Sequence, residues 1–142
     1  MDDRFDLQRF VEAQDGVYAQ VLAELGAGRK TSHWMWFVFP QIAGLGFSAM
    51  AQRYAISGRE EAEAYAAHLV LGPRLRECTG LVLAVKGRTA HQIFGSPDDV
   101  KFRSSMTLFQ ACASESQIYQ DALERYFEGV PDPLTLERLQ RR

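Results

Sequence analysis

Hydrophobic residues recur at helical spacing along most of the chain, and this pattern predicts an all-α fold. The first stripe predicts a single helix from Asp6 to Leu25, with Asp6 as its N-terminal cap and Gly26 and Gly28 ending it. The hydrophobic positions of this stripe are Leu7, Phe10, Val11, Tyr18, Val21, Leu22 and Leu25. Its expected role is packing.

The later helices are predicted from capping residues, glycines and prolines. They are expected over residues 47–56, 57–68, 73–87 and 89–94, from 97 to before 114, from 114 to 129, and for a turn or two after 133. Residues 57–60 and 114–117 resemble capping boxes, in which the first and fourth residues bind each other's backbone amides. Ser96 is interpreted as a cap, followed by Pro97 in the first turn and two acids at the positive end of the helix dipole.

One stretch departs from the amphipathic pattern, namely residues 30–48, KTSHWMWFVFPQIAGLGFS. It holds both tryptophans, and its run from Trp34 to Phe39 is too short for periodicity to distinguish a buried strand from a short buried helix. Pro40 ends the run because proline lacks a backbone donor. We therefore expect a compact multi-helical domain with at most one or two short strands near Trp34–Phe39.

The glycines of this stretch match a nucleotide-binding pattern, because residues 44–49 read GLGFSA. A dinucleotide-binding loop needs a strand before the glycines and alternating strands and helices in the rest of the chain. The helical pattern of this chain favours turn chemistry instead. An isolated anion-binding helix start is the alternative left open.

Composition narrows the class of protein. A chain of 142 residues with 46% hydrophobic and 24% charged residues predicts one globular domain over 1–142. The net charge of −2 argues against a nucleic-acid partner, and the absence of a long apolar run argues against a membrane partner. Cys78 and Cys112 form no CxxC motif, and no signal peptide is evident, so a reduced, cytoplasmic protein is expected. The histidines lack metal-ligand spacing, so neither a metal nor a cofactor is predicted.

Two polar groups are the candidates for chemistry. The first lies in the stretch that contains the aromatic run and comprises Lys30, His33, Trp34, Trp36, Gln41 and Ser48. The second is a row on one helix face, in which Asp98, Lys101 and Ser105 are spaced by three and four residues. The structural interpretation is a core of aromatics, a hydrogen-bonded histidine, and a helix cap with a surface ion pair. The functional interpretation is that the row faces the aromatic stretch and holds an anion.

These residues resemble a known family, the small bacterial family called domain of unknown function 1810. The resemblance rests on residues 29–41, 44–46 and 48, then on 54–56, 61–65, 71–75, 93–95, 98–101 and 104–109. It implies an all-helical single domain without an established activity. One departure is Leu69, where the family usually has proline after the histidine. Members are often labelled "calpastatin", but that inhibitor is a long disordered chain, unlike this aromatic-rich one.

Two hypotheses for function follow. The first is that a small anionic ligand, nucleotide-like or ADP-ribose-like, binds beside the aromatic stretch and undergoes N-glycosidase-type hydrolysis. It draws on a fainter resemblance of residues 98–106 to N-glycosidases that act on ADP-ribose-like and riboflavin-intermediate substrates. Asp98 and His33 are then the catalytic candidates. The ligand-binding candidates are Lys30, Trp34, Trp36, Gln41, Ser48, Lys101 and Ser105. The second hypothesis is a non-catalytic protein-interaction or structural module. Under either hypothesis we expect a monomer or a weak homodimer.

Overall fold

The fold is all-helical, as the hydrophobic pattern predicts. The computed structural model describes residues 3–141, which contain ten helices and, outside them, one isolated parallel β-bridge between Ile42 and Ile56. The helices are α1 (Gln8–Asp15), α2 (Tyr18–Gly26), α3 (Met35–Val38), α4 (Ala49–Arg53), α5 (Arg59–Ala67), α6 (Leu71–Ala84), α7 (Ala90–Phe94), α8 (Asp98–Cys112), α9 (Gln117–Phe127) and α10 (Pro133–Gln140). In the described range, every helix is too short or too polar to cross a bilayer.

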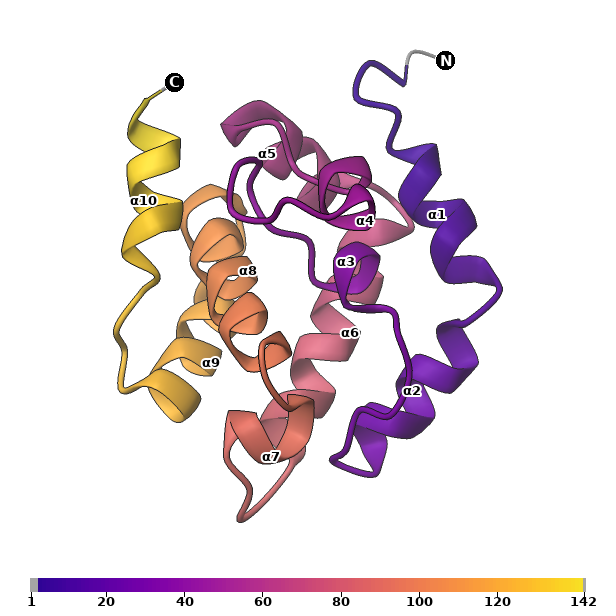
Figure 1. Ribbon diagram of the computed structural model, residues 1–142, viewed down its shortest axis with the longest axis vertical. Helices are drawn as coiled ribbons and strands as arrows, with labels where there is room; N and C mark the ends of the chain where they lie inside the picture. Colours follow the sequence, from indigo (N-terminus) through magenta and orange to yellow (C-terminus); the bar gives the residue numbers. More distant parts are fainter. Residues whose placement is uncertain (1–2, 142) are drawn as a thin grey trace.

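Helix α8 lies at the centre of the fold, in contact with α5, α7, α9 and α10. Figure 1 shows α1 and α2 on one side of the molecule and α10 on the opposite side. Phe102 on α8 is fully buried and packs against the rings of Phe39, Phe94, Tyr126 and Phe127. This aromatic cluster fixes the first half of α8 against the residues that follow α3, which is the region of both candidate polar groups.

The single helix predicted over residues 6–25 is wrong, because the chain bends at Gly16 and Val17 between α1 and α2. The bend lets α1 pack against α3 while α2 packs against α6. Gln14 at the end of α1 is buried and donates to the carbonyl of Phe37 at 2.7 Å. Tertiary packing therefore overrides a stripe that would continue through an isolated helix.

The predicted cap of this first helix is also wrong. Asp6 adopts a left-handed conformation with φ of 52° and does not cap α1. Instead, the carboxylate of Asp3 accepts the amides of Leu7 and Gln8 at 2.7 and 3.0 Å. These hydrogen bonds lower the pKa of Asp3. An acceptor placed further upstream thus satisfies the free amides of the first turn.

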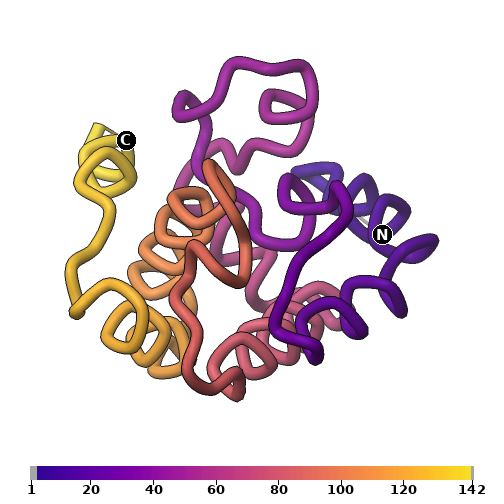
Figure 2. The backbone as a smooth tube through the Cα atoms, turned by 60° about the horizontal axis from the view of Figure 1, so that its bottom comes forward, coloured from indigo at the N-terminus to yellow at the C-terminus, as the bar shows by residue number. Residues whose placement is uncertain are grey.

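The aromatic run forms the short helix α3 rather than a strand, and Phe39 closes it by donating its amide to the carbonyl of Met35. The glycine motif after it is a turn, as its helical context favours, and Gly44 has φ of +97°. Ser48 caps α4, which has five residues. Figure 2 shows this segment projecting at the top of the view, beyond the other helices.

The helix predicted over residues 89–94 is confirmed, and its start and that of α10 are set by caps that lie close in the sequence. Thr89 and Gln92 form a capping box at α7, and Gly95 ends that helix at φ of +72°. Pro133 occupies the first turn of α10, which Asp132 caps by accepting the amide of Thr135. These signals are readable because each cap and its partner lie within one turn.

Four other predicted starts are corrected. Ser57 donates its amide and hydroxyl to Glu61, both at 2.8 Å, rather than pairing with Glu60. Pro73 is the third residue of α6 rather than the first, and Pro97 is itself the N-cap of α8, with no side-chain cap. The box predicted over residues 114–117 does not form, because no side chain caps α9.

Candidate functional site

The segment before α3 is held by one buried carboxylate, that of Glu24 in the last turn of α2. Its Oε1 accepts the amides of Thr31 and Ser32 at 2.8 and 3.0 Å and the indole N–H of Trp34 at 2.9 Å. Its Oε2 accepts the hydroxyl of Ser32 at 2.5 Å and the amide of Gln20 at 2.7 Å. Four of these five donors belong to residues 31–34, and they fix the path of the segment that carries Lys30 and Trp34.

Burial acts to raise the pKa of Glu24, but the hydrogen bonds from Ser32, Thr31, Gln20 and Trp34 outweigh it and hold that pKa well below its usual range. The carboxylate is therefore ionised at neutral pH. Sequence reasoning missed this residue. One signal was available, because an acid in the last turn of a helix faces the negative end of the dipole and needs a compensating partner.

Lys30 lies beside this network and forms the most enclosed ion pair of the region. Its ammonium is 2.7 Å from Oδ2 of Asp98 and 2.6 Å from the carbonyl of Ser32, to which it donates. It also lies 5.0 Å from the ring centroid of Trp34. The side chain of Lys30 is 7% exposed and that of Asp98 is 20% exposed. The charge of Lys30 is therefore already paired with that of Asp98 within the protein.

Lys101 approaches the same carboxylate from the opposite side. Its ammonium is 3.8 Å from Oδ1 of Asp98 and 5.5 Å from the ring centroid of Trp36, and its side chain is 24% exposed. Asp98 thus lies between two lysines, and each lysine lies over one of the two tryptophans. Asp98 and Lys101 of the polar row on α8 therefore face the aromatic stretch, whereas Ser105 does not. Of the two lysines that share Asp98, Lys101 is the more distant and the more exposed.

Two backbone features bring these residues together. The amide of Lys30 donates to the carbonyl of Ile93 on α7 at 2.7 Å, which fastens the segment before α3 to the helix before α8. Asp98 is the first residue of α8, so it and Lys101 lie on adjacent turns of one helix face. The site is therefore assembled from two segments that are distant in the sequence.

The two tryptophans have different surroundings. Trp34 is 1% exposed and lies in the core, where its ring packs against Phe39. Trp36 is partly exposed, and its other neighbours are Gln41, Gly46 and Tyr54, which line a small hollow of about 20 Å³ with it. That space is about the volume needed for one water molecule. Trp36 is thus the indole that can meet a ligand.

Three further candidates lie around this centre without joining it. His33 is exposed, and within residues 3–141 no hydrogen bond involves its ring. Ser48 is exposed and accepts the amide of Ala51 as the cap of α4. Ser105 is fully buried one helical turn beyond Lys101, and its hydroxyl has no hydrogen-bond partner in the described chain.

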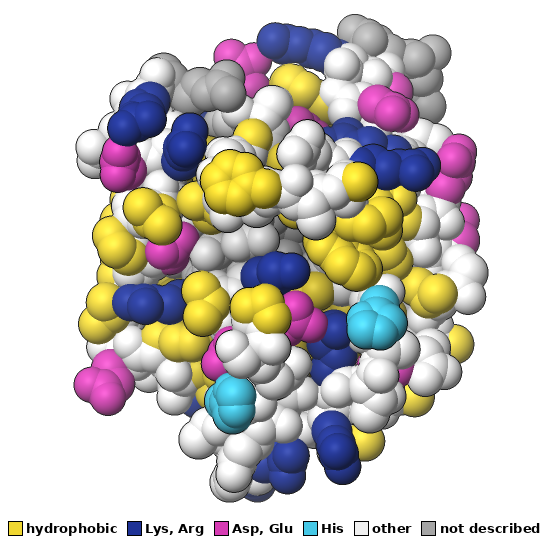
Figure 3. Space-filling model, viewed as in Figure 1, with side chains coloured by type: hydrophobic (Ala, Val, Ile, Leu, Met, Phe, Trp, Pro, Cys, Tyr) yellow, Lys and Arg dark blue, Asp and Glu magenta, His cyan; other side chains and the backbone are white. Residues whose placement is uncertain are grey.

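The surface over the cluster combines hydrophobic area with charges of both signs. Near the middle of Figure 3, basic and acidic side chains lie next to each other between hydrophobic areas, and a histidine lies close by. Such an arrangement can stack a planar group on an exposed ring, hold an anionic group by an ammonium, and present a carboxylate nearby.

Comparison with known proteins places the chain in a family. No curated protein sequence matches it. A solved structure, the crystal structure of the conserved hypothetical protein Rv1873 from Mycobacterium tuberculosis, is similar over 97% of this chain and 99% of that chain, with 55% sequence identity and a TM-score of 0.96. Residues 4–139 match the family described as "Protein of unknown function (DUF1810)". The resemblance noted in the sequence is thereby confirmed, and the chain belongs to the DUF1810 family.

Proposed function

We propose that the surface formed by Trp36, Gln41 and Lys101 binds a small anionic ligand of the nucleotide or ADP-ribose class. One observation carries the proposal. Lys30 already pairs with Asp98 at 2.7 Å, whereas Lys101 lies at 3.8 Å from that carboxylate and remains partly exposed above a partly exposed indole. A planar base would stack on Trp36, and a phosphate would accept hydrogen bonds from the ammonium of Lys101.

The finer proposal is hydrolysis of an N-glycosidic bond in that ligand. Asp98 is the carboxylate beside the surface, and its negative charge would stabilise the positive charge that develops on the sugar. Water would add to the anomeric carbon as the carbon–nitrogen bond breaks. The proton that this water loses would pass to the released base, and His33, an exposed residue of the segment before α3, is the proposed carrier. The products would be the sugar phosphate and the free base.

Binding is tested by calorimetry and thermal shift with ADP-ribose, NAD and AMP. The informative variants are Trp36→Ala and Lys101→Met. Lys86→Met is the matched control, because Lys86 is an exposed lysine just after the C-terminus of α6. We expect the first two variants to weaken binding about tenfold or more, which corresponds to about 1.4 kcal/mol. No stabilisation of the wild-type protein at millimolar ligand, or equal effects of Lys86→Met, would contradict the proposal.

Hydrolysis is tested separately by chromatography of the ligand after incubation. Asp98→Asn should abolish product formation, and a protein that binds ligand without turning it over supports the binding proposal alone. The non-catalytic alternative has one observation in its favour, the exposed side chain of Phe47, at 82%, on the loop beside Trp36. A concentration-dependent dimer that Phe47→Ser removes, together with no nucleotide binding, would favour that alternative.

A further inference from the structure

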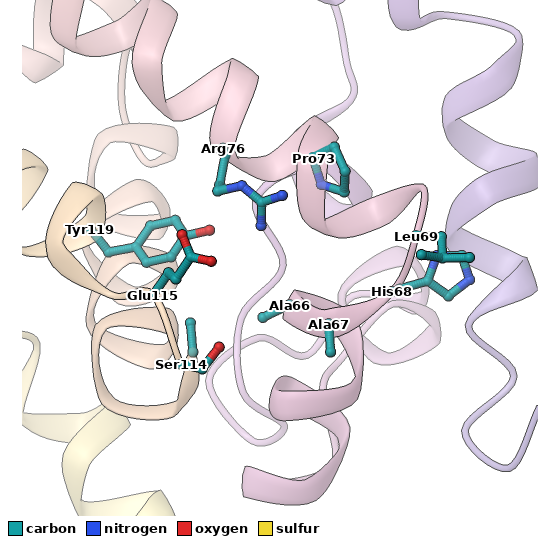
Figure 4. A pocket seen from close by; sticks show the side chains of 10 residues that line it. Ala66, Ala67, His68, Leu69, Pro73, Arg76, Ser114, Glu115 and Tyr119 are labelled. Carbon is teal, nitrogen blue, oxygen red and sulfur yellow. The ribbon is translucent and has the colours of Figure 1, made fainter.

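A second hollow lies away from the tryptophans, between the end of α5, the first turns of α6 and the loop that joins α8 to α9. Its volume is about 240 Å³. One wall is apolar and is formed by small or rigid side chains, including Ala66, Ala67 and Pro73. Figure 4 shows Glu115 and Tyr119 across the hollow from Ala66 and Ala67, and Arg76 reaching into it from the helix that carries Pro73. The hollow is therefore apolar on one side and polar on the other.

Tyr119 is the most unusual of these residues. Its side chain is 1% exposed and its ring packs against Phe109, yet its hydroxyl forms no hydrogen bond with residues 3–141. Burial raises the pKa of Tyr119 to about 12, with smaller and opposite effects from Arg76 and Glu115. The hydroxyl is therefore neutral at physiological pH and has a free hydrogen to donate. The ring of Tyr119 is buried, whereas its hydroxyl is accessible from the hollow and is open to a hydrogen bond with a ligand.

Arg76 and Glu115 place opposite charges around that hydroxyl. Arg76 projects from α6 and Glu115 from the loop before α9, and both line the hollow. Figure 4 shows the guanidinium, the carboxylate and the hydroxyl directed toward the same space. Across the described part of the chain, neither charge forms a salt bridge. The cation and the anion are thus presented together without neutralising each other by contact.

We propose that this hollow binds a free α-amino acid with a small apolar side chain. The carboxylate of the amino acid accepts hydrogen bonds from the guanidinium of Arg76 and the hydroxyl of Tyr119, and its ammonium donates to the carboxylate of Glu115. Its side chain packs on Ala66 and Pro73. The size of the hollow agrees, because about 240 Å³ is below the range of roughly 300–1,000 Å³ that is usual for drug-sized ligands.

This site is independent of the nucleotide surface. The residues that line the hollow do not include Trp36, Gln41 or Lys101. The same chemistry rules out a simple anion as the preferred ligand, because Glu115 would repel a second negative charge. A zwitterion satisfies the donor, the acceptor and the apolar wall at once, whereas a simple carboxylic acid or a simple amine satisfies only one charge.

The test uses matched ligands on the full chain. Calorimetry and amide-shift mapping are carried out with L-alanine, L-valine and L-leucine, and with L-alaninamide and N-acetyl-L-alanine, which lack the carboxylate and the ammonium respectively. We expect at least one free amino acid to bind at millimolar concentration or below and to shift the resonances of residues 114–119. Alaninamide and N-acetylalanine should each bind about tenfold more weakly or worse than alanine. No binding of any free amino acid, or binding of either analogue as tight as that of alanine, overturns the proposal.

Three conservative variants assign the contacts. Tyr119→Phe removes only the hydroxyl and keeps the packed ring, so it should weaken amino-acid binding without unfolding the protein. Arg76→Gln should abolish the preference for alanine over alaninamide, and Glu115→Gln should abolish the preference for alanine over N-acetylalanine. Glu12→Gln, at an exposed position on α1, is the control and should change neither preference. Preferences that survive in Arg76→Gln and Glu115→Gln would show that the ligand binds elsewhere and would overturn the assignment.

Discussion

The ammonium of Lys30 lies 2.7 Å from the carboxylate of Asp98, and this pair joins the segment between α2 and α3 to the first turn of α8. Because Asp98 is also approached by Lys101, the two lysines share one carboxylate but differ in role. Lys30 is enclosed and also donates to the carbonyl of Ser32, whereas Lys101 is partly exposed. Lys30 is therefore a structural cation, whereas Lys101 is the cation that the proposed ligand would contact.

Replacing these lysines should affect stability unequally. Lys30→Met removes the close partner of Asp98 and a donor to a backbone carbonyl, and we expect the free energy of unfolding to fall by about 2 kcal/mol. Lys101→Met should change it by less than about 1 kcal/mol, because that pair is longer and partly solvated. Urea unfolding of both variants measures the difference. Equal losses of stability would mean that Lys101 is as structural as Lys30.

Removing the charge of Glu24 should destabilise the segment before α3. Glu24→Gln loses an ionised acceptor that holds five donors, and we expect unfolding to become easier by about 2 kcal/mol at neutral pH. The emission of Trp34 should change as well, because its indole N–H loses a charged partner. Gln20→Ala, which removes only one of the five donors, is the milder comparison.

The effect of Glu24 should also depend on pH in a defined direction. Its pKa in the folded protein lies below the ordinary value of 4.5, so the folded state holds fewer protons than the unfolded state at acidic pH. Its contribution to stability is therefore complete above about pH 4.5 and declines as the pH falls below that value. The difference between wild type and Glu24→Gln, measured by urea unfolding at several pH values, should shrink on acidification. A difference that stays constant down to strongly acidic pH would contradict this assignment.

Replacing Arg9 by lysine should lower the stability of the fold. Its guanidinium donates to the carbonyls of Phe5, Asp6, Arg53 and Ala55 and to the carboxylate of Glu61, and so it joins α1 to the chain between α4 and α5. An ammonium has three donors at one point and cannot reach this set. Arg9→Lys should lower the free energy of unfolding by about 1–3 kcal/mol.

The control for Arg9 is another arginine of the same region. Arg4 pairs with Glu60, but both side chains are well exposed, at 67% and 69%. Arg4→Lys should therefore leave the urea midpoint almost unchanged. If Arg9→Lys is as mild as Arg4→Lys, the five hydrogen bonds of Arg9 do not contribute to stability as the geometry implies.

The helices could be predicted where the deciding contacts are local. Thr89 and Gln92 reveal the start of α7 because they cap each other within one turn. The bend at Gly16 could not be predicted, because it depends on buried Gln14 meeting the carbonyl of Phe37. A stripe of hydrophobic residues carries no information about which partner helix each half will meet.

The same difference between local contacts and contacts of distant segments holds for the candidate site. The spacing of Asp98 and Lys101 revealed their proximity, because three residues span about one helical turn. The pairing of Asp98 with Lys30 joins two distant segments, and nothing in the spacing of either segment indicates it. Arg76 and Tyr119 likewise line one hollow from two distant segments, because Arg76 lies on α6 and Tyr119 lies on α9.

The thiol of Cys78 should be inert in the folded protein and should make the fold less stable in alkali. Burial raises its pKa to about 12, with a smaller opposing effect of the hydrogen bond with the hydroxyl of Tyr18. The folded state therefore keeps its proton above the ordinary thiol pKa of 9.0, where the unfolded state loses it. The stability that this thiol contributes is complete below about pH 9 and is lost as the pH rises toward the pKa of the folded state.

In a Cys112→Ser background, iodoacetamide should label Cys78 about a hundredfold more slowly in buffer than in denaturant, because the thiolate reacts only after local opening. Rapid labelling at neutral pH in buffer would show that the α6 face is open in solution and that burial does not protect the thiol.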